Sequence, residues 1–166
     1  MEIEIIKHSE ISKEYLLRII DIKNVAWPHP MESQLKWIED NLLPNDLHII
    51  LKEGETDYAY MNLCQVNAIV DGHNKMFMGV GNVCSKTKGK GYGGTLVSLV
   101  NKYLLNNGLK GLLFCKEHVM RFYAHYGWCI VENEKVFMAK NGYNDIYLMS
   151  YNICPFDKIM YCDRFF

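Results

Sequence analysis

The spacing of apolar residues changes along the first half of the chain. Residues 2–7 alternate charged and apolar side chains, which is typical of a short strand with one wet face. Apolar residues then recur at helical spacing, and Ser9 or Ser12 can cap the helix that this spacing predicts. The helix should stop before the segment Trp27–Pro30, because each proline disfavours helix in the residue before it.

A second short helix is expected after Ser33, ending at Pro44. From Asp46 the period changes to two, which indicates strands separated by turns. Asp71–Gly72 is a hairpin signal, so the strands should form an antiparallel meander. The three expected strands are 47–52, 58–69 and 75–84.

The second half of the chain predicts a crossover. A glycine-rich loop opens into an amphipathic helix that Asn106–Gly108 should end, and a continuous apolar strand is expected over 111–115. The remaining expected elements are a helix over 117–126 and strands over 128–131, 135–139 and 145–153, with no clear period in the tail. This order predicts a mixed α/β fold with an antiparallel front half and a parallel β-α-β crossover, in one domain spanning 1–166.

Composition is that of an ordinary globular chain. Of 166 residues, 49% are hydrophobic and 22% charged, and the net charge of −1 argues against a nucleic-acid partner. The charged N-terminus lacks a secretory signal and no apolar run could span a bilayer, so we expect a cytoplasmic protein without a membrane partner. The six cysteines form no CxxC pair, so we expect reduced, buried thiols and no metal site.

The loop before the central helix has the chemistry of a phosphate site. Its glycines expose backbone N–H groups where a helix begins, and the helix dipole favours an anion there. Three lysines add positive charge. The glycines are Gly89, Gly91, Gly93 and Gly94, and the lysines are Lys86, Lys88 and Lys90.

Two common nucleotide-binding motifs do not fit this loop. A dinucleotide-binding fold requires GxGxxG after its first strand, and Gly79-Val-Gly81 lacks the third glycine. A Walker A loop requires Ser or Thr after its lysine, whereas Lys90 is followed by Gly91. Binding of ATP or NAD is therefore the least favoured interpretation of this loop.

Two segments resemble motifs of the GCN5-related N-acetyltransferases. Lys88-Gly-Lys90-Gly91-Tyr-Gly93 is similar to the pyrophosphate loop of that family, with Lys88 where Gln or Arg is usual. Tyr123-Ala-His-Tyr-Gly127-Trp128 resembles the family's Tyr-xxx-Gly-Phe segment, with Trp in place of Phe. The resemblance covers residues 76–131 and implies the acyl-CoA N-acyltransferase fold.

The resemblance implies acetyl-CoA as the co-substrate. Its pyrophosphate would rest on the glycine loop, and its pantetheine arm would lie along the strand near Gly81–Cys84. A backbone N–H near Val83 would stabilise the oxyanion, and Tyr123 would protonate the departing thiolate as general acid. The implied cofactor-binding residues are Asn82, Val83, Cys84, Lys88, Gly89, Lys90, Gly91, Tyr92, Gly93 and Gly94.

The general base stays open, because residues 77–83 contain no acid where many family members carry a Glu. Asn82 can hold a water molecule but cannot take a proton. The candidates elsewhere are Glu32, Asp46, Glu117, His29 and His118.

The expected acceptor is a primary amine of a small molecule or peptide. The second half and the tail 161–166 are faintly similar to aminoglycoside 2′-N-acetyltransferases. That similarity would imply a polycationic acceptor. Such an acceptor would need an acidic cleft. Its candidate contributors are Asp157, Asp163, the terminal carboxylate of Phe166, and Glu32 or Asp46.

One alternative belongs to a different functional class. A CoA-binding regulatory domain with little or no catalysis would also need the glycine loop, and the strand without an acid favours that reading. Aromatic residues in the tail are compatible with a homodimer.

Overall fold

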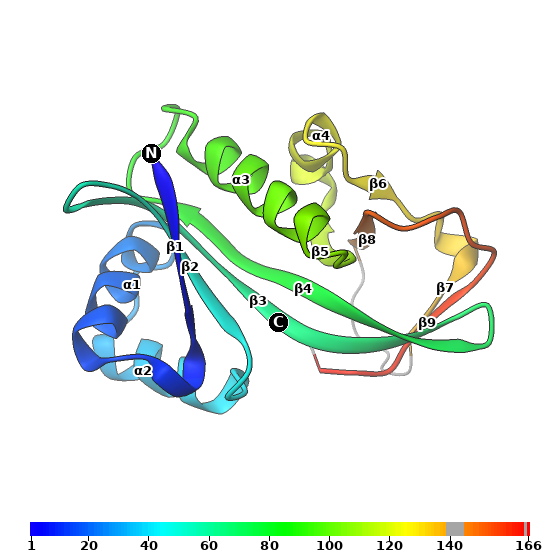
Figure 1. The fold of residues 1–166 in the computed structure, drawn as a ribbon, viewed down its shortest axis with the longest axis horizontal. Coiled ribbons are helices and arrows are strands. Elements are labelled where there is room, and N and C mark those ends of the chain that lie inside the picture. The colour runs from blue at the N-terminus through cyan, green and yellow to red at the C-terminus, as the bar shows by residue number, and fades with distance from the viewer. Residues whose placement is uncertain (139–144, 165) are drawn as a thin grey trace. The chain divides into compact units, whose positions relative to one another are not determined.

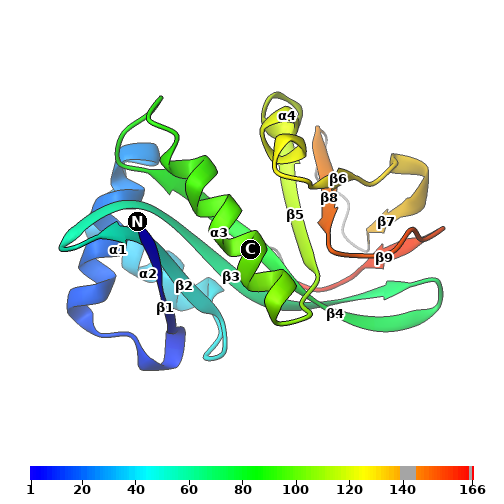
Figure 2. The same cartoon turned by 45° about the horizontal axis from the view of Figure 1, so that its top comes forward.

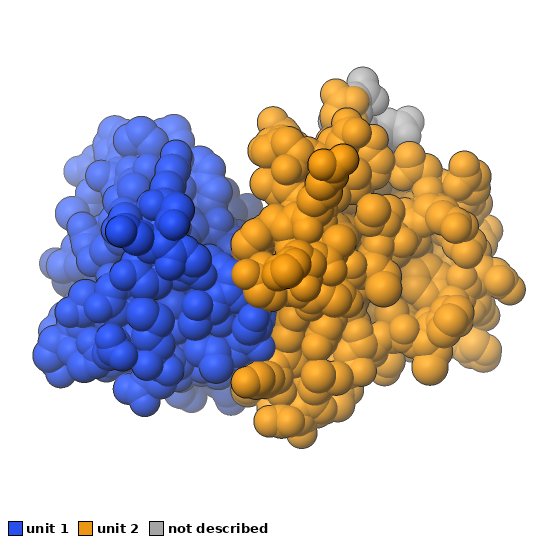
Figure 3. Space-filling model, turned by 90° about the horizontal axis from the view of Figure 1, so that it is seen from above, with its two compact units in different colours: residues 1–64, 81–100, 166 blue, residues 65–80, 101–165 orange. Residues whose placement is uncertain are grey.

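The computed structural model describes residues 1–138, 145–164 and 166. These residues form two compact units, coloured separately in Figure 3. Unit 1 comprises residues 1–64, 81–100 and 166, and unit 2 comprises residues 65–80 together with the described part of 101–165. Strands β3 (Thr56–Val70) and β4 (His73–Ser85) and helix α3 (Tyr92–Asn106) each contribute residues to both units. The expectation of a single domain stays a prediction.

Unit 1 contains two complete helices and the first part of α3, together with two complete strands and segments of β3 and β4 (Figure 1). Strand β2 pairs antiparallel with both β1 and β3, as the alternating pattern predicts. Helices α1 and α2 contact each other. The elements are β1 (Glu2–Lys7), α1 (Lys13–Ala26), α2 (Met31–Asn41) and β2 (Leu47–Glu53), with a 3-10 turn at His8–Glu10.

The two helices differ in how they begin. The Ser12 hydroxyl accepts the Tyr15 N–H at 3.1 Å, so Ser12 caps α1, and the helix ends at Ala26 as expected. Helix α2 begins at Met31 rather than after Ser33. The Pro30 carbonyl accepts the Gln34 N–H, and no side chain caps this helix. Pro30 is the N-cap residue and the helix starts one residue later, so Ser33 lies inside the first turn.

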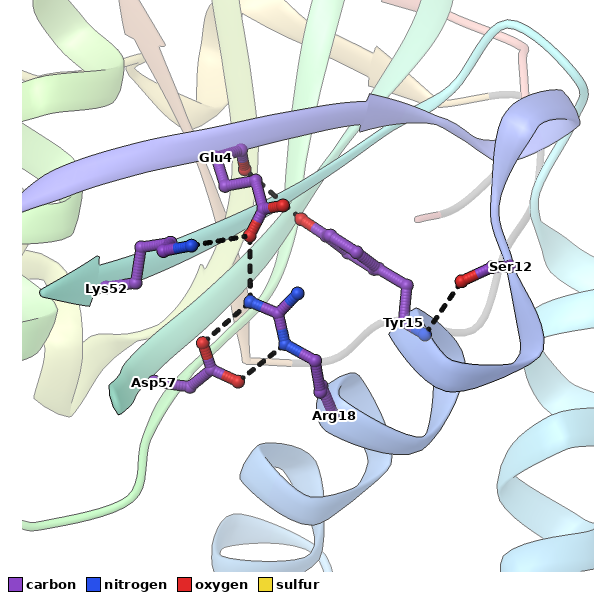
Figure 4. A network of polar contacts seen from close by, with 6 residues as sticks. All are labelled: Glu4, Ser12, Tyr15, Arg18, Lys52 and Asp57. Atoms are coloured by element: carbon purple, nitrogen blue, oxygen red, sulfur yellow. Dashed lines mark hydrogen bonds and ion pairs between the residues drawn. The ribbon is translucent and has the colours of Figure 1, made fainter. Parts of the chain in front are cut away.

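An ion-pair network ties α1 to the sheet (Figure 4). The Arg18 guanidinium donates to both oxygens of Asp57, at 2.9 and 2.8 Å, and to Glu4 at 2.8 Å. Lys52 lies 3.7 Å from the same Glu4 carboxylate. Hydrogen bonding from Arg18 lowers the pKa of Asp57. The Tyr15 hydroxyl also donates to the Glu4 carbonyl, so strands β1, β2 and β3 are all linked to this helix.

The expected antiparallel meander and crossover are both present. Asp71 and Gly72 have φ of 51° and 80°, which suits a two-residue hairpin between the neighbouring strands β3 and β4. Helix α3 then leads to β5 (Gly111–Lys116), which pairs parallel with β4 at two positions, Met78 with Gly111 and Gly79 with Leu112. The mixed α/β fold is thus confirmed.

Unit 2 contains one complete helix and the last part of α3, together with the other strands and the remaining segments of β3 and β4 (Figure 2). Strand β8 pairs antiparallel with β5 and β6, while β9 pairs antiparallel with β3 and parallel with β7. Strand β9 has only three residues, too few to show a period, so the sequence did not predict it. The expected strand over 135–139 is observed to residue 138, and residue 139 lies outside the described part. The elements are α4 (Glu117–His125), β6 (Cys129–Ile130), β7 (Val136–Met138), β8 (Ile146–Tyr151) and β9 (Ile159–Tyr161), with a 3-10 turn at Asn133–Lys135.

The cysteines are all free, as expected, but only half are buried. Cys64, Cys84 and Cys115 lie in long strands of the core, whereas the other three are exposed. The burial prediction was wrong for those three because they lie in the two-residue strand β6 or outside any strand. They are Cys129, Cys154 and Cys162.

No helix in the described ranges is long and apolar enough to cross a membrane.

Candidate active site

The glycine loop is anchored to β3 at both ends within unit 1. Before the loop, the Lys86 N–H donates to the Tyr58 carbonyl at 2.8 Å. After it, the Tyr92 ring packs on the Tyr58 ring, with centroids 4.5 Å apart. Two contacts to one strand residue therefore fix the place where α3 begins.

The start of α3 has free backbone donors. The Gly91 carbonyl accepts the Thr95 N–H at 2.9 Å, and among the described residues no acceptor is found for the N–H groups of Tyr92, Gly93 and Gly94. Gly89 and Gly91 have φ of 76° and 78°, with no atom within 4 Å of a Cβ built on either. A left-handed glycine loop before unpaired first-turn amides fits a pyrophosphate.

The three loop lysines are not equivalent. Lys86 forms an ion pair of 2.5 Å with Asp21 of α1, so much of its charge is neutralised. Lys88 and Lys90 are exposed and form no ion pair in the parts of the chain described. The net positive charge available to an anion at this loop therefore comes from Lys88 and Lys90.

Strand β4 changes conformation just before the loop. Asn82 has a left-handed φ of 53°, and its amide donates to the Asn62 side chain at 2.6 Å. A left-handed residue other than glycine is uncommon inside a strand and is found at bulges and binding sites. The Cys84 side chain is only 7% exposed, and burial raises the pKa of its thiol to about 12. Cys84 can therefore contribute its backbone to a ligand but not a thiolate.

Gly81, one residue earlier, is required for close packing. A Cβ there would lie 2.8 Å from the main-chain carbon of Phe166 and 3.2 Å from the Asn62 amide nitrogen. Phe166 therefore lies against the strand segment in which the sequence predicts pantetheine binding.

Tyr123 lies on α4 in unit 2, half-buried beside two other aromatic rings. Its ring meets Phe122 and Trp128 edge-on, with centroids 5.0 and 6.3 Å away. Burial raises the pKa of its hydroxyl, with the Cys115 thiol adding to the effect. Because its pKa is raised, the hydroxyl is protonated at neutral pH. It has no hydrogen-bond partner among the described residues, so it is available to donate.

Trp128 fixes the chain segment that follows Tyr123. Its indole N–H donates to the Asn101 side chain at 3.0 Å, and the Asn101 amide donates to the Tyr126 carbonyl at 2.8 Å. Trp128 is 3% exposed, and a Cβ on Gly111 would lie only 2.6 Å from its ring. The glycine that begins β5 thus leaves room for the Trp128 ring.

A cavity of about 400 Å³ lies within unit 1. Helices α1 and α2, the segment between them and the end of β4 all supply lining residues. Its aromatic and cationic lining residues are Trp27, Trp37 and Lys23. Its other lining residues are His29, Ser33, Gln34 and Asn82.

Sequence reasoning gave no binding role to most of this lining, and the charged residue that it missed is Lys23. It is 4% exposed, and its ammonium lies 4.3 Å from the centroid of the Trp37 ring. Burial lowers the pKa of Lys23 from 10.5 to about 8. The available signal was its position beside Ile22 and one turn after Ile19 and Ile20, on the buried side of α1.

The candidate bases lie in different environments. His29, Glu32, Glu117 and His118 are all exposed, and of these four only His29 lines the cavity described in unit 1. The Asp46 carboxylate is fully buried and accepts the Leu43 N–H at 2.7 Å, so it holds a turn.

The residues expected to build an acidic cleft also form local contacts. Asp163 accepts the backbone N–H groups of Asn67 and Arg164, each at 2.7 Å. Asp157 donates its own N–H to Asp71 at 3.0 Å. None of the residues that line the cavity described in unit 1 is acidic.

Comparisons with solved structures identify the fold. An acyl-CoA N-acyltransferase from Pseudomonas aeruginosa is 14% identical and covers 91% of this chain and 99% of its own, with a TM-score of 0.62. ElaA from Escherichia coli is 17% identical, with a TM-score of 0.62, and the match covers 90% of this chain and 98% of ElaA. The fold is that of the GCN5-related N-acetyltransferases.

A third similar structure contains a ligand. It is an aminoglycoside 6′-N-acetyltransferase complexed with coenzyme A, 14% identical over 92% of this chain and 98% of its own, with a TM-score of 0.63. This enzyme is a 6′-N-acetyltransferase, so it does not support the similarity to 2′-N-acetyltransferases expected from the tail. That similarity stays a prediction. No family model matches the chain. No curated protein sequence matches it.

Proposed function

We propose that the protein is an acetyl-CoA-dependent N-acetyltransferase that acts on the primary amine of a small molecule. The observation that carries the proposal is the set of amides of Tyr92, Gly93 and Gly94, which have no acceptor among the described residues and follow two left-handed glycines. Combined with a fold that a CoA-bound acetyltransferase shares, this loop is best suited to the pyrophosphate of an acyl-CoA.

The residues of unit 1 would hold the donor along β4 and the loop. Lys88 and Lys90 add charge beside the amide cradle, and the backbone of Asn82, Val83 and Cys84, which follows the left-handed Asn82, would offer N–H and C=O groups to the pantetheine arm. Acetyl-CoA supplies an activated thioester. The Val83 N–H is the donor proposed for the oxyanion that forms when the amine attacks.

The leaving thiolate needs a proton as the carbon–sulfur bond breaks. Tyr123 is proposed as the donor because its hydroxyl is unpartnered in the described structure and its raised pKa keeps it protonated. Among the candidate bases, His29 lines the cavity, and we propose that it takes the proton of the acceptor amine.

The test separates catalysis from simple CoA binding. Calorimetry with CoA should show binding by the wild type, and a thiol-detecting assay with acetyl-CoA and a panel of primary amines should show CoA release. Binding without thiol release from any amine would favour the regulatory alternative. No binding at all would overturn both.

A further inference from the structure

The cavity of unit 1 contains a buried positive charge without a negative partner. Lys23 is 4% exposed, and in the described parts of the chain its ammonium forms no ion pair or hydrogen bond. Its charge lies against the Trp37 ring and also interacts with the Cys84 thiol, which is neutral at physiological pH. Removing an ammonium from water is costly unless an anion compensates it, and the lining of this cavity offers none.

A second feature of the cavity also favours an anion. The first turn of α2 supplies Ser33 and Gln34 to the lining, and this eleven-residue helix begins at Met31, after an N-cap residue, Pro30, whose side chain cannot cap it. Its first N–H groups therefore lack a side-chain acceptor, and the helix dipole is positive at this end. Lys23 and the start of α2 therefore both favour a negatively charged group in this cavity.

The remaining lining suits an apolar group and an amine. Trp27 and Trp37 supply broad ring faces. Gln34 is 4% exposed and uses its amide N–H groups on the Trp27 carbonyl, at 3.0 Å, and on Asn24. Its side-chain oxygen accepts no hydrogen bond from the described residues, so it can accept one from the N–H of a ligand.

We propose that the acceptor is an aromatic amino acid or a close analogue, with its carboxylate bound by Lys23 and its ring packed against Trp27 and Trp37. This inference rests on the proposed function, which assigns the protein an amine acceptor. A cavity of about 400 Å³ accommodates a molecule of this size. A polycation is disfavoured because it would meet the Lys23 charge with no carboxylate in the lining to offset it.

The first test uses two probes that differ only by the carboxylate. Binding of L-phenylalanine and of 2-phenylethylamine to the full chain is measured by calorimetry, with and without saturating CoA. A charge-assisted contact predicts that phenylalanine binds about 10-fold tighter or more. Equal affinities, or no binding of phenylalanine up to about 10 mM, would overturn the inference whether or not CoA binds.

The second test replaces Lys23. Lys23→Met should lower phenylalanine affinity about 10-fold or more and leave phenylethylamine affinity unchanged or slightly higher. Lys36→Met is the matched control, since Lys36 lies on α2 in an exposed i,i+4 pair with Asp40 and should alter neither probe. An unchanged preference for phenylalanine in Lys23→Met would contradict the assignment. The wild-type comparison decides the matter if that variant does not fold.

The third test distinguishes failure of the inference from failure of the proposed function. Thiol release from acetyl-CoA should be fastest with phenylalanine, slower with phenylethylamine and slowest with an aminoglycoside. Release with the aminoglycoside but not with phenylalanine would overturn the inference and leave an N-acetyltransferase. CoA binding that fails in a separate titration would remove the proposed function, while the two-probe comparison without CoA would still decide the role of Lys23.

Discussion

Asn101 and Lys23 are both polar residues buried on helices, one in each compact unit, and their surroundings differ. Asn101 is 6% exposed and uses both ends of its amide, one on the Trp128 indole and one on the Tyr126 carbonyl. Lys23 is 4% exposed, and its charge lies beside the Trp37 ring and the Cys84 thiol, without an ion pair or hydrogen bond among the described residues. Fully paired buried polar groups hold a structure together, whereas an unpaired one costs stability and indicates a binding site.

The same distinction separates the aromatic residues. Trp128 packs against Tyr151, with ring centroids 5.4 Å apart, and its N–H is bonded. Trp27 and Trp37 line the cavity, and Trp27 is 40% exposed. The cavity of unit 1 therefore presents aromatic surface to a ligand, while Trp128 in unit 2 fixes the segment after Tyr123.

The largest expected effect concerns the unpartnered hydroxyl of unit 2. Tyr123→Phe should lower kcat by about 100- to 1000-fold, because the leaving thiolate loses its proton donor. Stability should change little, since the hydroxyl makes no hydrogen bond in the described structure. Tyr126→Phe, on a ring that packs on the same Phe122, is the matched control for the thiol-release assay. Equal rates for the wild type and Tyr123→Phe would remove Tyr123 from the acid role.

A substitution at the paired residue should instead affect folding. Asn101→Leu leaves the Trp128 N–H and the Tyr126 carbonyl without partners, so the free energy of unfolding should fall by about 2–3 kcal/mol. Lys23→Met removes a buried charge that has no partner, and should be neutral or stabilising. Urea unfolding of both variants measures the contrast. Equal destabilisation would mean that Lys23 is as well satisfied as Asn101.

The stability of the wild type should also depend on pH through Lys23. Its folded pKa of about 8 lies below the unfolded value near 10.5, so the unfolded state binds more protons between those values. The cost of burying the ammonium is fully present below pH 8. It is relieved as pH rises towards 10, by about 2 kcal/mol. Relative to Lys23→Met, the wild type should gain stability over that interval in urea unfolding, and a constant difference would contradict a depressed pKa.

The smallest expected effect compares two glycines that share a left-handed backbone. Gly91 in the loop and Gly108 after α3 have φ of 78° and 63°, and neither has an atom within 4 Å of a built Cβ. Alanine should therefore cost about 1 kcal/mol of stability at either position. Only Gly91→Ala should also weaken CoA binding in calorimetry. Equal CoA affinities in the two variants would argue against the loop as the pyrophosphate site.

Much of the fold could be predicted from local patterns. The Ser12 cap, the hairpin at Asp71–Gly72 and the helix after the glycine loop each depend on residues adjacent in sequence. The start of α2 was misplaced because Ser33 was taken as the residue that precedes the helix, whereas the Pro30 carbonyl already accepts the Gln34 N–H as N-cap residue. Strand β9 was missed because its place depends on pairing with the distant strands β3 and β7.

The sequence by itself determined the crossover fold and the glycine loop, because left-handed glycines, a cationic loop and an amphipathic helix are encoded within one stretch. Only the tertiary structure brought Lys23, Trp37 and Asn82 to one cavity and showed that Asn101 is paired while Lys23 is not. These residues lie far apart along the chain. Burial and pairing are set by which elements pack together, so a local pattern cannot show whether a polar side chain is satisfied.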